Sequence, residues 1–387
     1  MTKNKFDIAA LQQKFETLYN DKPIVVRSPG RVNIIGEHTD YNDGFVLPAA
    51  INKAIYIAVN KRSDEEINLF AQDYQQQHQS SLSTVAPSDK RWPNYILGVV
   101  DQLQKRGYQL GGFNLVIDGD VPLGAGLSSS AAVECATAFA LNHLFNLGIE
   151  KIEMVQAAQL AEHTFAGVMC GIMDQFASMF GKKDHVIKLD CRSLEYEYVP
   201  LDLKGYKILL LNTNVTHSLA SSEYNTRRKQ CEQGVAWIKE HKPYINSLRD
   251  ADLQMLNDYV APKDAVIYMR CKFIVEEIMR LLTGCEDLKE GNIKALGEKM
   301  FRTHEGLSKE YEVSCKELDF LVESVKGNPA VLGARMMGGG FGGCTINLVQ
   351  EDKIDELVDK ISKEYKNAMN LELTAYVAEI ENGSSLM

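Results

Sequence analysis

The segment from Ala131 to about Phe145 is almost wholly apolar, and it follows a loop rich in glycine and serine. A helix that is apolar on every side must be buried inside a domain. Glu134, Asn142 and His143 interrupt the segment, which is also too short to cross a bilayer. Phe113–Asp118, which precedes the loop, has the composition of a strand. The chain therefore has to pack layers of strand and helix around this segment.

Residue patterns elsewhere predict an alternation of helices and strands. Helices are expected over 7–19, from Pro93 through Leu103, over most of the second half up to about Lys326, and over 352–367. Strands are expected over 23–27, which 28–30 breaks, and over 45–59, 186–189, 206–211, parts of 330–349, and 373–380. The polar tract 72–83 is expected to be a surface loop.

The length of 387 residues suits two domains at about 150 residues each. Segregated runs of strands and helices predict a two-lobed α+β protein, divided near residue 200 into lobes 1–200 and 201–387.

A net charge of −10 gives the chain no general attraction for nucleic acid or an anionic membrane. A nucleotide would have to be bound by local devices, namely backbone N–H groups, a metal ion or one well-placed arginine. The eight cysteines are scattered without a C-x-x-C pair, which predicts free thiols rather than a zinc site. Because the first residues also lack the apolar stretch of a signal peptide, we expect a cytoplasmic protein.

The loop Leu123–Ser130 contains Gly124, Ala125, Gly126, Leu127 and the serines Ser128, Ser129 and Ser130. Between a strand and a helix, its backbone N–H groups and the positive end of the helix dipole can face a phosphate. The loop lacks the Gly-Lys-Ser/Thr ending of a Walker A motif and the third glycine of a dinucleotide fingerprint. Its shape predicts phosphate binding, and a simple helix cap is the alternative.

A second glycine cluster spans Gly338–Gly343. It formally contains G-x-G-x-x-G, but the residues after it have strand character, whereas a dinucleotide loop opens a helix. We interpret it as a tight turn where the backbone passes close to another loop or to a ligand.

Polar residues crowd into Glu37–Asp40, on a turn between apolar strands and close to Arg31. A solvated turn is the simple interpretation. The alternative is recognition of a polyhydroxyl ligand, because sugar hydroxyls both donate and accept hydrogen bonds.

Asp174 lies between apolar neighbours and is either a structural cap or a general base. Glu162, twelve positions earlier on the same predicted helix, could hold a metal ion. Arg227–Lys229 is interpreted as a solvated helix face rather than a phosphate clamp.

Five motifs together resemble the galactokinase family, which belongs to a wider group with homoserine, mevalonate and phosphomevalonate kinases. Gly30–Asn42 is similar to the galactokinase signature, Pro122–Ala131 to the phosphate loop of the wider group, and Gly338–Gly343 to its third motif. Cys170–Gln175 and Ser221–Arg228 also resemble galactokinase segments, and the matches follow the family order over most of the chain.

The resemblance implies an N-terminal α/β lobe like ribosomal protein S5 and a C-terminal ferredoxin-like lobe, with the active-site cleft between them. It also implies ATP-dependent phosphorylation of the C1 hydroxyl of α-D-galactose, the entry step of galactose use. The sugar contacts that it implies are Glu37, His38, Thr39, Asp40, Gly171, Asp174 and Tyr224. Gly124–Ser130 would bind ATP, Ser130 and Glu162 would bind Mg²⁺, and Asp174 would act as the base with Arg31 as its partner.

Alternatives remain at this point. Within the same family, an N-acetylgalactosamine kinase would need room at C2 of the sugar. A silent sensor of sugar and ATP is expected to have lost site residues, whereas this chain keeps Arg31, Asp174 and the serines of the loop. We expect a monomer that binds galactose and MgATP but neither nucleic acid nor membrane. Trp92 and Tyr95 are candidates for the adenine pocket by position.

Overall fold

The first lobe is built on a six-stranded sheet in the computed structural model, which describes residues 6–215 and 220–387. The strands are β1 (Ile24–Asn33), β3 (Pro48–Lys61), β4 (Glu66–Ala71), β5 (Gln76–Ser81), β6 (Phe113–Gly119) and β13 (Ser385–Leu386). They lie in the order β13-β1-β3-β6-β4-β5, and every pair except β4 and β6 is antiparallel.

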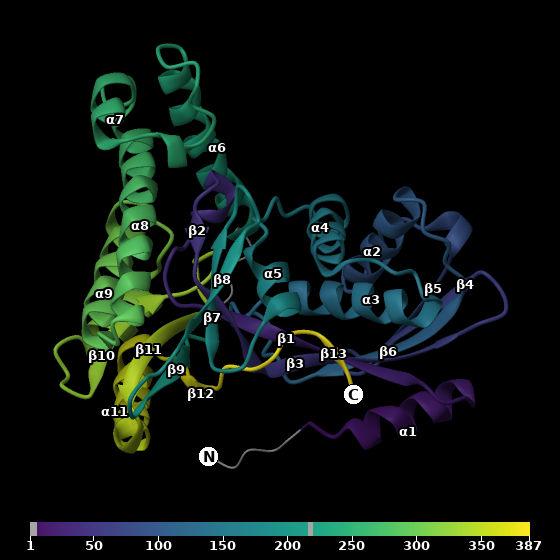
Figure 1. Ribbon diagram of the computed structural model, residues 1–387. Coiled ribbons are helices and arrows are strands. Elements are labelled where there is room, and N and C mark those ends of the chain that lie inside the picture. Colours follow the sequence, from purple (N-terminus) through teal and green to yellow (C-terminus); the bar gives the residue numbers. More distant parts are fainter. Residues whose placement is uncertain (1–5, 216–219) are drawn as a thin grey trace.

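Helices cover both faces of this sheet (Figure 1). They are α1 (Ile8–Tyr19), α2 (Asn94–Lys105), α3 (Ser129–Phe145), α4 (Lys151–Ala161) and α5 (Met173–Phe180). Leu11 and Phe15 of α1 pack with Val25 and Tyr56 on one face, and the other four helices lie on the opposite face. The apolar helix is α3, and it contacts α2, α4, α5 and the sheet, so its predicted burial is confirmed.

The second lobe contains a four-stranded antiparallel sheet. Its strands are β9 (Tyr206–Asn212), β10 (Val331–Met336), β11 (Cys344–Gln350) and β12 (Thr374–Ala378), in the order β10-β11-β9-β12. The helices of this half are α6 (Ala220–Lys239), α7 (Leu253–Tyr259), α8 (Ala265–Lys289), α9 (Ile293–Lys309), α10 (Lys316–Val325) and α11 (Ile354–Met369). Apolar residues of α10 and α11 pack with Leu209 and Leu211 of the central strand β9. The mixed two-lobed fold is therefore as predicted.

A small third sheet connects the lobes. It contains β2 (Phe45–Val46), β7 (His185–Asp190) and β8 (Tyr196–Pro200), in the order β2-β7-β8. β8 ends at Pro200, and β9 begins the second lobe, which supports a division near residue 200. The last residues nevertheless return to the first lobe, where Leu386 pairs with Val26 on β1. The boundary stays a prediction, and residues 1–5 and 216–219 of the two expected lobes lie outside the described residues.

Two local predictions are wrong. The strand expected to break at 28–30 continues through Pro29 to Asn33, because a shift of register against β3 between Pro29 and Arg31 accommodates the proline. The polar tract 72–83 contains a strand, β5, rather than forming a loop. β5 lies at the edge of its sheet and pairs with β4, so its polar side chains can face water.

All eight cysteines are free thiols, as predicted. In the described part of the chain, no helix combines the length and the apolar composition that a membrane crossing requires.

Candidate active site

Asp174 and Arg31 form a two-pronged ion pair at the centre of the candidate site. Arg31 lies on β1, and Asp174 lies in the first turn of α5. The arginine Nε and Nη2 atoms each donate to one carboxylate oxygen, and both distances are 2.8 Å. Burial acts to lower the pKa of Arg31, but the carboxylates of Asp174 and Glu37 outweigh it and raise that pKa overall. The guanidinium therefore stays charged beside Asp174.

The glycine- and serine-rich loop lies directly against this pair. Arg31 Nη1 donates to the carbonyl of Gly126 at 2.6 Å, and Arg31 N donates to the carbonyl of Leu127 at 3.1 Å. The loop needs glycine because φ is +72° at Gly124 and +74° at Gly126. Ser128 occupies the cap position of α3, but its hydroxyl donates to Asp174 Oδ2 instead of capping the helix. The simple cap interpretation is therefore wrong for this hydroxyl.

The second glycine cluster packs against the same loop. An added Cβ at Gly343 would lie 3.2 Å from Ala125, and one at Gly338 would lie 3.4 Å from the carbonyl of Gly126. Gly338 N also donates to Glu37 Oε1 at 2.9 Å. The sequence left two partners open for this turn, another loop or a ligand. The contact with another loop is confirmed.

Glu37 is buried in an ion pair that joins the two lobes. Its side chain is 2% exposed, and Oε1 lies 3.0 Å from Nη1 of Arg335, a fully buried residue of β10. Thr39 is buried as well, and its hydroxyl donates to the carbonyls of Gly36 and Phe45. The interpretation of this segment as a solvated turn is wrong.

His38 lies in a cluster of aromatic rings. Its ring centroid is 5.3 Å from that of Tyr224 and 5.0 Å from that of Tyr311, and Nδ1 lies 2.8 Å from the Tyr41 hydroxyl. Burial lowers the pKa of His38 to about 4, so the ring is neutral at pH 7. Its Nε2 is buried and has no hydrogen-bond partner among the described residues. A neutral, unsatisfied imidazole is suited to a polar ligand.

Tyr224 lies on α6 beside both lobes, next to His38, Tyr41 and Gly339. On the same helix, Arg227 is 7% exposed and donates to the carbonyls of Tyr311 and Glu312 at 2.8 Å. The prediction of a solvated face is therefore wrong for Arg227, because the adjoining chain segment supplies buried acceptors.

Gly171 and Asp40 are in close contact. A Cβ built on Gly171 would lie 1.8 Å from Asp40 Oδ2, so no other residue leaves this carboxylate in place. Gly171 precedes α5 and thereby connects the Asp40 turn to the helix that carries Asp174.

We expect Gly171→Ala to displace Asp40 and to raise the KM for the sugar that the family resemblance implies as substrate, since the added methyl group overlaps the carboxylate. Gly284→Ala on α8 is the matched control, because a Cβ there would meet flexible side chains at 3.3 Å and beyond. Steady-state kinetics of both variants measure the effect. An unchanged sugar KM in Gly171→Ala would remove Asp40 from the site.

The stability of the ligand-free protein should fall as pH rises toward 7. Burial and the neighbouring Asp174 raise the pKa of Asp40 to about 7, against about 3.9 in an unfolded chain. The folded state thus binds more protons between these values, and each proton difference contributes a slope of about 1.4 kcal/mol per pH unit. We expect the free energy of unfolding of Asp40→Asn to fall less steeply with pH than that of the parent, and to exceed it at pH 8. Denaturant unfolding between pH 5 and 8 measures this, and parallel curves would contradict it.

The Ser130 hydroxyl lies close enough to the Glu162 carboxylate to act to lower its pKa, so the two expected metal ligands lie together. Glu162 and Asp174 come from different elements. α4 ends at Ala161, Glu162 begins a short π-helix, and α5, which carries Asp174, begins at Met173. The expectation that Glu162 and Asp174 share one helix is therefore wrong. Burial, followed by the charge of Asp174, raises the pKa of Glu162 to about 7. Keeping this carboxylate charged therefore costs free energy, which a bound cation would offset.

Within residues 6–215 and 220–387, no group of three histidine, cysteine or acidic side chains is placed to hold a metal ion. A hydroxyl and one carboxylate fit Mg²⁺, which usually takes one or two carboxylates together with substrate phosphates.

Trp92 and Tyr95 give no direct sign of a ligand. Trp92 is 9% exposed and its Nε1 donates to Gln76 on β5, while burial raises the pKa of Tyr95 to about 12. Their assignment to the adenine pocket stays a prediction.

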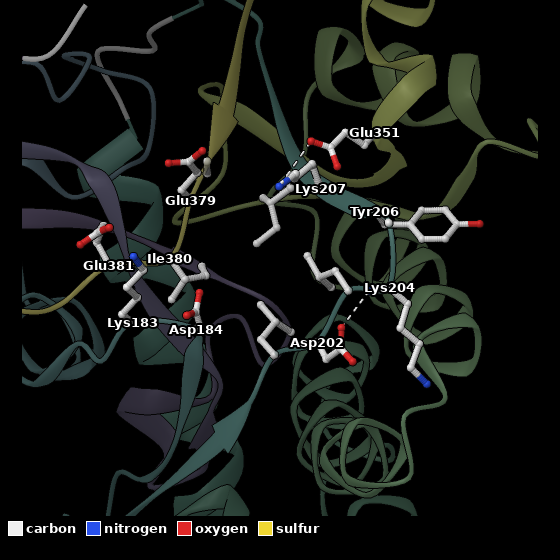
Figure 2. Close-up of a pocket in the computed structure, with 15 residues that line it drawn as sticks. Lys183, Asp184, Asp202, Lys204, Tyr206, Lys207, Glu351, Glu379, Ile380 and Glu381 are labelled. Carbon is white, nitrogen blue, oxygen red and sulfur yellow. Dashed lines mark hydrogen bonds and ion pairs between the residues drawn. The ribbon is translucent and has the colours of Figure 1, made fainter. Parts of the chain in front are cut away.

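A cavity of about 470 Å³ lies away from these residues, where the chain passes between the lobes (Figure 2). Its lining includes the segment 201–208 and the segment 378–381, with Lys207 lying 3.5 Å from Glu351. None of the predicted site residues lines this cavity.

Sequence reasoning missed three buried residues next to the site: Arg335, Glu134 and Gln175. Arg335 could have been noticed as a lone charge in an apolar strand, and Glu134 as a lone charge in the apolar helix. Gln175 gives no such signal.

Three family models match the chain. A galactokinase galactose-binding signature covers residues 13–61, a GHMP kinase N-terminal domain 94–182, and a GHMP kinase C-terminal domain 286–367. The mevalonate kinase of Methanococcus jannaschii shares the fold, with a TM-score of 0.64 at 19% identity over 93% of this chain and 99% of that one. Fold and site together define a GHMP kinase.

More specific relatives are galactokinases. That of Thermotoga neapolitana is 42% identical over 92% of this chain and 98% of its own, and that of Clostridium acetobutylicum is 40% identical over 97% and 98%. The crystal structure of Lactococcus lactis galactokinase complexed with galactose has a TM-score of 0.94 at 35% identity, covering 98% of this chain and 100% of that one. The chain belongs to the galactokinase family.

Proposed function

We propose that this galactokinase transfers the γ-phosphoryl group of ATP to the C1 hydroxyl of α-D-galactose, with Asp174 as the general base. The observation that carries the proposal is the position of Asp174. Its carboxylate accepts from both prongs of Arg31 and from Ser128, beside the glycine- and serine-rich loop. This carboxylate therefore lies between Arg31 and the loop that we propose binds the phosphates.

In this mechanism Asp174 accepts the proton of the attacking hydroxyl. Phosphoryl transfer then depends on in-line positioning and on neutralising charge rather than on covalent chemistry. Arg31 supplies a fixed positive charge, and its hydrogen bond to the Gly126 carbonyl ties that charge to the phosphate loop. One guanidinium thus orients the base and approaches the transferred group.

For the sugar we propose direct contacts from Glu37, His38, Asp40, Gly171 and Tyr224. The unpartnered Nε2 of His38 and the carboxylate of Asp40 supply polar groups to its hydroxyls. Thr39 contributes by holding the turn, because its hydroxyl is already bonded to two carbonyls.

For the nucleotide we propose that the backbone of Gly124–Ser130 binds the phosphates, with Mg²⁺ held by Ser130 and Glu162. The bound cation would neutralise phosphate charge together with Arg31, within a protein whose net charge is −10. We also propose a cytoplasmic location, which the eight free cysteines support. The monomeric state and the absence of nucleic-acid and membrane binding stay predictions.

The decisive experiment is ADP release with a panel of sugars. Site groups that expect particular hydroxyls reject an epimer at a cost of about 1–3 kcal/mol for each unpaired group. We expect galactose to be turned over far faster than glucose and N-acetylgalactosamine. Comparable rates on glucose would contradict the proposed contacts, a preference for N-acetylgalactosamine would favour that kinase, and tight binding without turnover would indicate a sensor.

A further inference from the structure

Gln175 connects two buried acidic side chains behind the proposed metal site. It follows Asp174 on α5 and is fully buried. Its Nε2 donates to Glu162 Oε2 at 2.8 Å and to Glu134 Oε2 at 3.0 Å. Glu134 is also fully buried and lies on α3, one turn after Ser130. The two hydrogens of the amide thus face these carboxyl groups, and the Cys170 sulfur lies 3.8 Å from the same nitrogen.

The arrangement carries an energetic cost. The remaining side-chain oxygens of Gln175 and Glu134 are buried and lack hydrogen-bond partners within the described part of the chain. An unsatisfied buried polar atom destabilises a fold, and an apolar pair of the same shape would avoid the cost. The two hydrogen bonds from the amide to Glu162 and Glu134 offset part of this cost.

Burial, reinforced by the charge of Glu162, raises the pKa of Glu134 well above its usual range, so the charged form of Glu134 is disfavoured in this arrangement. A neutral carboxyl can still accept from Gln175 through its carbonyl oxygen. Glu162 is the member of the group that also contacts Ser130.

We propose that Gln175 is a positioning residue that holds the Glu162 carboxylate in place for the nucleotide-bound Mg²⁺, with Glu134 orienting its amide. This inference rests on the proposed role of Glu162 as a metal ligand. Because Gln175 and Asp174 are neighbours on one helical turn, α5 sets both the base and the metal-binding carboxylate. A shift of this helix would displace the two together.

The first test is the Mg²⁺ dependence of Gln175→Met, which keeps the length of the side chain but removes both donors. Residues that orient metal ligands typically contribute about 10–100-fold to metal affinity, so the half-saturating Mg²⁺ concentration should rise by that range. The galactose KM should stay at the parent value. Glu134→Leu should act in the same direction, and Glu134→Gln, which retains a carbonyl acceptor, should have a smaller effect.

Ser178→Ala is the matched control. Ser178 lies on the same helix, and its hydroxyl is buried without a hydrogen-bond partner in residues 6–215 and 220–387. Its Mg²⁺ dependence should equal that of the parent.

The second test measures binding without turnover. Calorimetry gives the affinity for ATP in excess chelator and for ATP with Mg²⁺, and the ratio reports the contribution of the metal. In Gln175→Met the ratio should fall while metal-free ATP binding is retained. If both affinities fall equally, or neither changes, Gln175 has a structural role and the inference is wrong. Glu162→Gln separates the role of Glu162 as a metal ligand from the positioning role of Gln175. If Glu162→Gln keeps the parental ratio of the two ATP affinities, the metal site itself is misassigned.

Discussion

Asp174→Asn is expected to lower kcat by at least about 10²–10⁴-fold, the usual contribution of general base catalysis. The asparagine amide remains able to hydrogen-bond the sugar but cannot accept its proton, so sugar affinity should be largely kept. It also turns one donor toward Arg31, where the native carboxylate accepts from both prongs at 2.8 Å.

Single-turnover phosphorylation, with folding verified by circular dichroism, measures the effect. Asp89→Asn, at an exposed aspartate, is the matched control and should behave as the parent. Turnover of Asp174→Asn within a few-fold of the parent would show that Asp174 is not the base.

The variants of Arg31 extend the same experiment. Arg31→Lys keeps the charge but loses the planar fork, so it should cost less activity than Arg31→Ala. Because Arg31 and Asp174 act as a unit, the double variant should be much less impaired than the product of the single losses. Multiplicative losses would indicate two independent roles.

Arg335→Met is expected to lower the free energy of unfolding by about 3–5 kcal/mol, because it leaves the buried carboxylate of Glu37 without its charge partner. Arg335 also donates through Nε to the carbonyl of Ile34 at 2.9 Å and through Nη1 to that of Met336 at 2.7 Å. These acceptors, on both sides of the lobe junction, lose their donors as well.

Denaturant unfolding of the ligand-free protein measures this loss. Arg302→Met is the control, since Arg302 is 68% exposed in its pair with Glu305, and surface pairs contribute about 0–1 kcal/mol. The double variant Arg335→Met/Glu37→Leu should recover part of the stability. A loss in Arg335→Met no larger than in Arg302→Met would contradict the importance of the pair.

Local sequence patterns correctly predicted the helices and loops whose own residues carry one clear signal. The apolar composition of α3 required a buried helix, and the glycines of the loop that precedes it have positive φ angles. The proximity of Arg31 and Asp174 came from the family resemblance, because no local rule connects residues so far apart in the chain.

Sequence patterns failed where tertiary structure overrides local preference. Pro29 lies within β1 because the register shifts beside it, and the polar β5 forms a strand because it lies at an edge. The helical segment that contains Glu162 ends at Gly167, whose φ is +76°, so it does not continue to Asp174. Arg227 is charged like its neighbours on α6, and its burial depends on carbonyls that another segment supplies.

The pairing of β13 with β1 affects how the chain can fold during translation. Val26 and Arg27 leave the ribosome early, whereas their partners Leu386 and Ser385 emerge after the whole second lobe. Until then, β1 remains an unprotected edge of the nascent sheet, and such edges are prone to pair with other chains. The first lobe therefore cannot complete its sheet until the second lobe has been synthesised.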